Sequence, residues 1–439
     1  MKIKKLAIYL PLLLVEIYLI GTIAIFLFGP INYYLESPFE FFCYIFFYHV
    51  CALFGYFVGV SRTQCSVVQS QSTFSYRLYY VLLVVGLLAF LLGHKNITGA
   101  DSIIPFDLID GIRGGLNNSS EQYVLRNESQ ALYSGDKVLN ALYFIIAFSK
   151  IIIIPVVVFY WDRLTILARF FGVALSILPV LSGISTGTNS PVFHFVIFYG
   201  ASLFLFFARN KILMGRCNFK SRSFFLYTVI SLFLFALVFF GNAMLGRGGD
   251  PFYLETTSSL GHIKVDPSYI NSDGDSFASY LYVWLSNYLV QGYYGLSRAM
   301  EVDFTSTLGF GSSQFVARQV EWLFGIDVLS ATYQHKVNSV WDENAQWHSM
   351  YSHLANDFHF FGVGILMFII FYNFARVWLS FICLDSFYAK LLLPLFCLMF
   401  VFMPANNQVF GFLEPLSAFL IIYVCWLAKI PRYFTRHLK

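Results

Sequence analysis

The sequence predicts an all-α protein that crosses a membrane about ten times, in a range of 10 to 12, with one large loop on the outer side. Of its 439 residues 58% are hydrophobic and only 12% are charged, whereas a soluble domain carries about 25% charged residues. Apolar runs of about 20 residues, enough to cross the hydrocarbon core, recur along the chain. These observations exclude a soluble enzyme, a disordered chain and a nucleic-acid-binding domain.

The apolar runs predict ten spans. The first follows a basic start and has no small-residue cleavage site after it, so we expect an uncleaved span and not a signal peptide. The predicted spans are 6–28, 39–60, 77–93, 139–160, 164–181, 191–208, 223–245, 354–378, 387–403 and 409–428.

The distribution of charge predicts the orientation. With the N-terminus inside, most Lys and Arg residues fall in the inner segments, as the positive-inside rule requires, and Asp162 and Asp385 are the only acidic residues there. Both termini are then cytoplasmic. None of the seven cysteines lies in a long outer loop, so we expect no disulfide bonds.

Two outer loops are long, at 94–138 and 246–353. The second contains an apolar, aromatic segment at 278–298, which fits an eleventh span, a re-entrant piece or an amphipathic helix on the outer surface. We favour the amphipathic helix, because one extra span would reverse the C-terminus and remove the charge bias.

Two charges fall near the middle of predicted spans, Glu16 and Lys150. A charge in lipid is costly, so such groups pair or serve as a relay for protons or substrate. Because a relay usually needs a longer chain of ionisable groups, the favoured interpretation is a Glu16–Lys150 pair that holds two helices together.

Several outer arginines suggest an anion site. Arg247 stands among glycines at 246–251, which fits either an anion-binding loop or a plain turn. Arg298 and Arg318 follow near aromatic residues, where they could bind a lipid pyrophosphate or only lipid headgroups. Arg113 and Arg126 in the first loop are weaker candidates, because simple solvation explains them.

Asn189, in the turn at 185–191, fits a tight turn or a polar floor for a substrate.

A histidine-rich stretch supplies the other chemistry. His353 and Asp357 share a helix face at a spacing of four residues, and His348 lies just before them. We interpret His353 with Asp357 as a general base or a sugar-binding pair, with capping of the next span as the structural alternative. His348, His353 and Asp357 are our candidates for the base and for orienting the acceptor. We expect no metal site, because no zinc motif occurs and no cysteine is near, and no cofactor.

By layout and by local motifs the chain resembles the Wzy-type O-antigen or oligosaccharide repeat-unit polymerases of bacteria. The resemblance rests on many spans with one large late outer loop, on Tyr288–Leu296 (YLVQGYYGL), on Asn356–Gly364 (NDFHFFGVG) and on Arg247 at the outer end of the seventh span. One departure is visible. Related enzymes often carry a basic residue between spans five and six, where this chain has Asn189.

The resemblance implies a GT-C-like helical fold in the bacterial inner membrane. It implies polymerisation of undecaprenyl-pyrophosphate-linked oligosaccharide repeat units into O-antigen, or a similar surface polysaccharide, at the periplasmic face. The partners would be the lipid-linked oligosaccharide, membrane lipid and a separate chain-length regulator protein. Two alternatives stay open. A flippase or transporter would need more charges along a path through the bilayer, and an O-antigen ligase runs the same reaction with another acceptor.

Overall fold

The computed structural model describes residues 4–63, 74–100, 102–132, 137–214, 219–248, 263–269 and 277–434. Within these ranges eight helices are long and apolar enough to cross a membrane. The chain is therefore an all-α polytopic membrane protein. The eight segments are Lys5–Phe28, Pro38–Ser61, Tyr76–Thr98, Val138–Arg163, Ile166–Ser185, Ser190–Leu213, Leu226–Arg247 and Met350–Leu384.

The last two predicted spans also form helices. The apolar helix α16 (Phe387–Phe402) has only 16 residues, and α17 (Leu413–Phe434) has 22. Neither is among the eight, so the count of ten spans stays a prediction.

The chain divides into two compact units, which are described separately. The first comprises Met1–Ser66, Asp250–Leu379 and Leu398–Phe412, and the second comprises Val67–Gly249, Ser380–Cys397 and Leu413–Lys439. The division separates the predicted site residues. Arg113, Arg126 and Arg247 belong to the second unit, whereas Arg298, Arg318, His348, His353 and Asp357 belong to the first.

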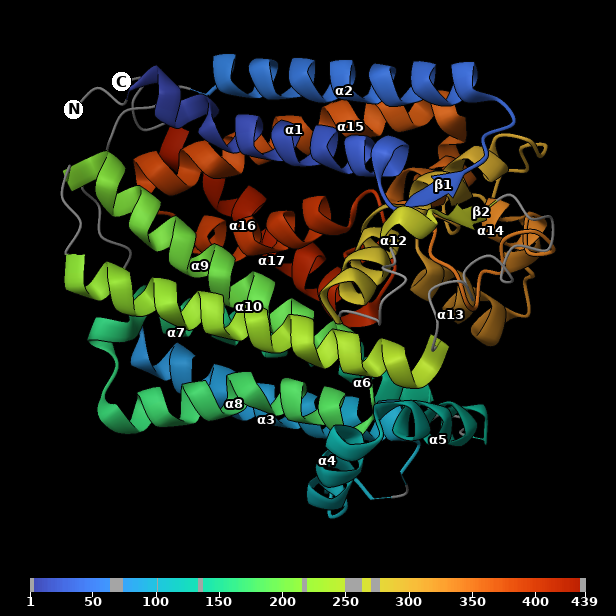
Figure 1. Cartoon of the computed structure of the whole chain (residues 1–439). Helices are drawn as coiled ribbons and strands as arrows, with labels where there is room; N and C mark the ends of the chain where they lie inside the picture. The colour runs from blue at the N-terminus through green and yellow to red at the C-terminus, as the bar shows by residue number, and fades with distance from the viewer. Residues whose placement is uncertain are drawn as a thin grey trace. The chain divides into compact units, whose positions relative to one another are not determined.

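In the first unit, α1 (Lys5–Phe28) and α2 (Pro38–Ser61) run side by side and are joined through β1 (Ile31–Tyr33) (Figure 1). Strand β1 pairs antiparallel with β2 (Ile263–Val265), which is followed by the short 3-10 helix η2 (Pro267–Tyr269). The remaining elements are the helices α12 (Phe277–Ala299), α13 (Gln314–Phe324), η3 (Leu329–Ala331) and α14 (Tyr333–Lys336) and most of α15 (Met350–Leu384).

Helix α12 covers the segment predicted to lie on the outer surface, but protein encloses its second half. Every residue from Val290 to Ala299 is buried. The cause is close packing at two glycines. A Cβ at Gly292 would meet the backbone of Pro404 and Ala405, and one at Gly295 would come within 2.9 Å of the His348 ring. Part of the aromatic loop therefore forms the core of this unit.

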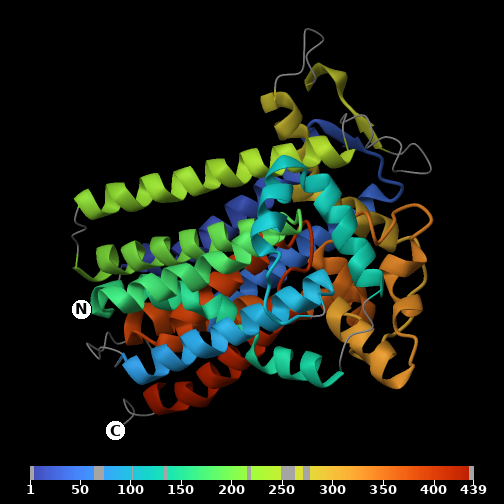
Figure 2. The ribbon, with the colours of Figure 1, turned by 90° about the horizontal axis from the view of Figure 1, so that it is seen from below.

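The second unit is built mainly from long helices. They are α3 (Tyr76–Thr98), α6 (Lys137–Ile146), α7 (Phe148–Tyr160), α8 (Ile166–Ser185), α9 (Ser190–Met214), α10 (Phe219–Gly248), α16 and α17, with a 3-10 turn, η1 (Trp161–Arg163), after α7. Figure 2 shows α8, α9 and α10 side by side, as their packing requires.

The first outer loop, predicted at 94–138, contains two helices, α4 (Leu108–Asn117) and α5 (Ser119–Leu132). Helix α4 packs on α8. Gly111 and Gly115 permit this approach, because a Cβ at either would meet the backbone or side chain of α8 at Ser185 or Ile184. The loop therefore has a fixed structure at the outer end of the unit.

The predicted Glu16–Lys150 pair is wrong, because each residue has another partner. In the first unit Glu16 Oε2 lies 2.6 Å from His49 Nδ1. In the second, Lys150 Nζ lies 2.6 Å from Glu414 Oε1, and the Tyr143 hydroxyl also donates to Glu414. Sequence reading missed Glu414 because it stands in the first turn of α17, where a charge looks like the end of a span.

The expectation of no disulfide bond is also wrong, because Cys383 is disulfide-bonded. That expectation rested on the compartment. The compartment decides whether a disulfide persists, but the fold decides whether two sulfur atoms meet.

Candidate functional site

Two of the five predicted arginines meet at the outer end of the second unit. Arg247, at the end of α10, lies over the Tyr123 ring with its Cζ 3.9 Å from the ring centroid, and Arg126 lies 5.7 Å from the same centroid. Tyr123 and Arg126 are both on α5. Burial lowers the pKa of Arg126, Tyr123 acts in the opposite direction, and the positive charge of Arg247 lowers it again. Two cations held this close attract an anion.

The turn between α8 and α9 completes this arginine cluster (Tyr123, Arg126, Arg247 and residues 187–189). Arg247 donates a hydrogen bond from its Nη2 to the carbonyl of Gly187. Gly187 has a φ of +62°, and a Cβ there would meet the backbone of Ser119, so only glycine fits. Both polar atoms of the Asn189 side chain are buried and make no hydrogen bond within the described residues. A buried amide without a partner is costly, so Asn189 favours the predicted polar floor.

Two of the other three predicted arginines, Arg113 and Arg318, lie at exposed positions. Arg113 is exposed and pairs with Asp110 at 3.3 Å within α4. Arg318 is exposed on α13 in the first unit. Surface positions of this kind contribute little to binding a specific anion, so the structure gives these two predictions no added support. The glycine loop that follows Arg247 lies at residues 249–251, outside the described residues.

Arg298 has a different setting, in the first unit. Its side chain is 8% exposed, and Nη1 lies 2.6 Å from Glu36 and 3.1 Å from Glu301. Burial disfavours the charge of Arg298, but the two carboxylates more than offset it, so its pKa is raised. A pyrophosphate would have to compete with both carboxylates. This geometry favours a structural role for Arg298.

The Asp357 carboxylate organises the loop at 307–312. It accepts hydrogen bonds from the Thr307 hydroxyl and from the backbone N–H groups of Gly309, Gly311 and Ser312, the last at 2.7 Å. Four hydrogen bonds hold this carboxylate in one position against the loop. The role of Asp357 as a base stays a prediction, and its contacts favour holding this loop.

Asn356 also holds loop residues in place, at Gly311 and at the start of α14. Its Nδ2 donates to Gly311 O at 2.9 Å and to Gln334 Oε1 at 2.7 Å, and its Oδ1 accepts from Tyr333 N at 2.9 Å. The Asn356–Gly364 motif therefore opens with two side chains that fix the outer loops onto α15. At His359 the backbone departs from helical geometry, with a φ of +56°, which separates these residues from the apolar part of α15.

His348 and His353 lie together in the first unit, with ring centroids 6.3 Å apart. Both are buried, and neither ring nitrogen of His348 makes a hydrogen bond within the described part of the chain. Burial, with a smaller effect of His353, lowers the pKa of His348 to about 3. His348 is therefore neutral at physiological pH and a weak base there.

Sequence reasoning missed two residues that matter. Tyr123 joins Arg126 to Arg247, and its one signal was its position three residues before Arg126. Glu36 neutralises Arg298 across more than 250 residues of chain, and no local pattern reveals such a pairing. In the described ranges no group of three or more His, Cys, Asp or Glu side chains could hold a metal ion.

Comparison with models of protein families, with curated proteins and with solved structures found no match to this chain.

Proposed function

We propose that this protein is a glycosyltransferase of the bacterial inner membrane that polymerises undecaprenyl-pyrophosphate-linked oligosaccharide repeat units into O-antigen or a similar surface polysaccharide. It would act at the periplasmic face, with both termini cytoplasmic and a GT-C-like fold. The observation that carries the proposal is the arginine cluster, which joins two guanidinium groups to the α8–α9 turn.

The chemistry fits this cluster. In the reaction the bond between the sugar's anomeric carbon and the pyrophosphate oxygen breaks, and a hydroxyl of the next unit forms the new bond. The pyrophosphate leaves with the electron pair, so cations that bind it stabilise the transition state. Arginine suits this task because its planar fork binds phosphate oxygens in pairs.

The cluster also accounts for the one departure from the family pattern. The turn between spans five and six has Asn189 where related enzymes often have a basic residue. Arg247 reaches that turn from α10 and donates to Gly187. We infer that Arg247 supplies from a neighbouring helix the positive charge that the turn lacks. A base must also take the proton of the acceptor hydroxyl. The roles of His348, His353 and Asp357 as that base, or in orienting the acceptor, stay predictions.

Deletion of the gene in its host, followed by electrophoresis of the lipopolysaccharide, tests the proposal. Loss of the polymerase leaves core carrying a single repeat and removes the ladder. Bare core would indicate a flippase or a ligase, and an unchanged ladder would contradict all three functions.

Point variants then test the cluster itself. Arg247→Ala should lower polymer yield by about 100-fold, the typical effect of removing one donor to a developing negative charge. Arg247→Lys should retain part of the yield, because lysine keeps the charge but not the fork. Lys264→Ala, which removes an exposed cation on β2, is the matched control. Equal ladders from Arg247→Ala and Lys264→Ala, at equal protein levels, would remove Arg247 from the site.

A further inference from the structure

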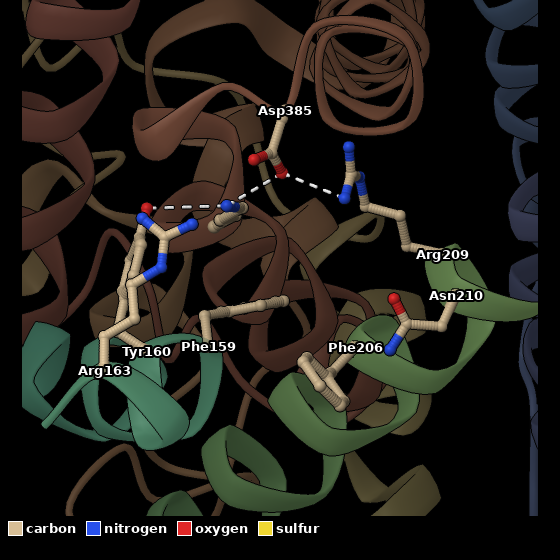
Figure 3. A pocket seen from close by; sticks show the side chains of 8 residues that line it. Phe159, Tyr160, Arg163, Phe206, Arg209, Asn210 and Asp385 are labelled. Carbon is tan, nitrogen blue, oxygen red and sulfur yellow. Dashed lines mark hydrogen bonds and ion pairs between the residues drawn. The ribbon is translucent and has the colours of Figure 1, made fainter. Parts of the chain in front are cut away.

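A second polar site lies in the second unit, where α7, η1, α9 and the start of α16 meet. It is a cavity of ≈ 160 Å³ (Figure 3). The positive-inside rule predicts this end of the helices to be cytoplasmic, opposite to the end where polymerisation is proposed. The lining residues are Phe159, Tyr160, Arg163, Phe206, Arg209, Asn210, Asp385 and Lys390.

The lining carries more positive than negative charge. Asp385 Oδ1 lies 3.2 Å from Arg209 Nη1 and 2.8 Å from Lys390 Nζ, so one carboxylate holds two cations (Figure 3). Arg163 adds a third cation to the lining. Three cations and one carboxylate leave a net charge of +2 in a partly enclosed space. Low exposure to water strengthens the attraction of such a space for an anion.

The position of Asp385 is fixed by its backbone as well as by its contacts. Its φ is +51°, in the left-handed region that non-glycine residues adopt at some cost. This conformation places Asp385 between α15 and α16, and Lys390 follows in the first turn of α16. The partial positive charge of that helix N-terminus adds to the field of the cations.

Apart from Asn210, the rest of the lining is aromatic. The Phe159 and Phe206 rings pack edge to face with centroids 6.4 Å apart, and Lys390 Nζ donates to the Tyr160 hydroxyl at 3.4 Å. A ligand with a phosphate at one end and an apolar part beside it matches both kinds of wall.

The geometry points to this pocket as a binding site for a phosphate group, carried by an anionic phospholipid headgroup or by a free phosphate. Arg163, Arg209 and Lys390 hold the phosphate oxygens, and Asp385 keeps the last two in place. The site is separate from the arginine cluster, and its test measures binding and not polymer.

Two binding measurements on the purified full-length chain test the site and separate the two sources. Native mass spectrometry counts bound phosphatidylglycerol against phosphatidylcholine. Thermal unfolding with inorganic phosphate alone measures binding of the free anion. We expect phosphatidylglycerol to be retained over phosphatidylcholine if the source is lipid, and a stabilising shift with inorganic phosphate if it is the free ion. If neither phosphatidylglycerol nor inorganic phosphate binds, the proposal is overturned.

The variants avoid the tightly packed ion pairs, whose loss could unfold the unit. Asn210→Asp adds a carboxylate to the lining and should weaken binding by about tenfold, and exposed Arg163→Gln by about threefold. Asn210→Gln keeps the lining neutral at that position and should bind as the wild type does. Lys211→Gln removes an exposed cation next to the pocket and outside its lining. If Lys211→Gln weakens binding as much as Arg163→Gln, the anion responds to the overall positive charge of this surface and not to the pocket, and the site is refuted.

Discussion

Arg298 and Arg247 are the same residue type in two opposite settings. Arg298, in the first unit, is buried between Glu36 and Glu301, which neutralise it. Arg247, in the second unit, lies beside another arginine and over an aromatic ring. Two carboxylates neutralise the buried Arg298, whereas Arg247 and Arg126 lie close enough to repel each other, which favours a bound anion. The comparison predicts that loss of Arg298 acts on stability and loss of Arg247 acts on activity.

Among the ion pairs, the buried pair of Lys150 and Glu414 should show the largest loss of stability when one partner is removed. The Lys150 side chain is 6% exposed, and Lys150→Met leaves Glu414 without its cation. Breaking a buried pair from one side costs about 3–5 kcal/mol of unfolding free energy, measured as a lower melting temperature in detergent.

A double change separates pairing from a relay role for these groups. Lys150→Met with Glu414→Gln should recover most of the lost stability, since neither residue then carries a charge. Lys150→Met with Glu16→Gln should recover none, because Glu16 pairs with His49. Recovery by the second double variant and not by the first would contradict the pairing in the structure.

Arg298→Ala tests directly whether Arg298 acts on stability and Arg247 on activity. It leaves two carboxylates close together without their cation, and we expect a loss of about 3 kcal/mol of unfolding free energy. Arg318→Ala, at an exposed position on α13, should lose less than about 0.5 kcal/mol. If Arg298→Ala abolishes polymer while its melting temperature is unchanged, then Arg298 binds ligand after all and the contrast with Arg247 fails.

Asp357→Asn should give a smaller loss, of about 2 kcal/mol. The amide keeps the shape of the carboxylate, but it loses the charge and presents one N–H₂ group to backbone donors of the 307–312 loop. Increased hydrogen exchange confined to this loop would identify the cause. Unchanged exchange with lost polymer would instead favour the predicted catalytic role.

The sequence predicted what depends on composition and local pattern. The helical class, the first eight predicted spans and the helix at 278–298 correspond to helices of the structure. Pairings between distant segments could not be predicted. Glu36 with Arg298, Glu414 with Lys150, and Tyr123 with Arg247 depend on packing that brings remote residues together. The burial of α12 was missed for the same reason, since its glycines permit close approach only once the partner backbone is known.

The smallest expected effect on stability concerns His348, because burial in the first unit disfavours its charged form. Burial lowers its pKa from 6.5 to about 3, so between these values the unfolded chain binds more protons at this residue than the folded chain does. Stability contributed by neutral His348 is therefore complete above pH 6.5 and decreases as the pH falls through this window. At pH 5.5 we expect a loss of about 1 kcal/mol relative to pH 7.5, seen as a lower melting temperature. His348→Gln cannot titrate and should show a shallower decrease over the same range. An identical pH dependence in the variant would mean that other groups cause the loss and that His348 is not held neutral by the fold.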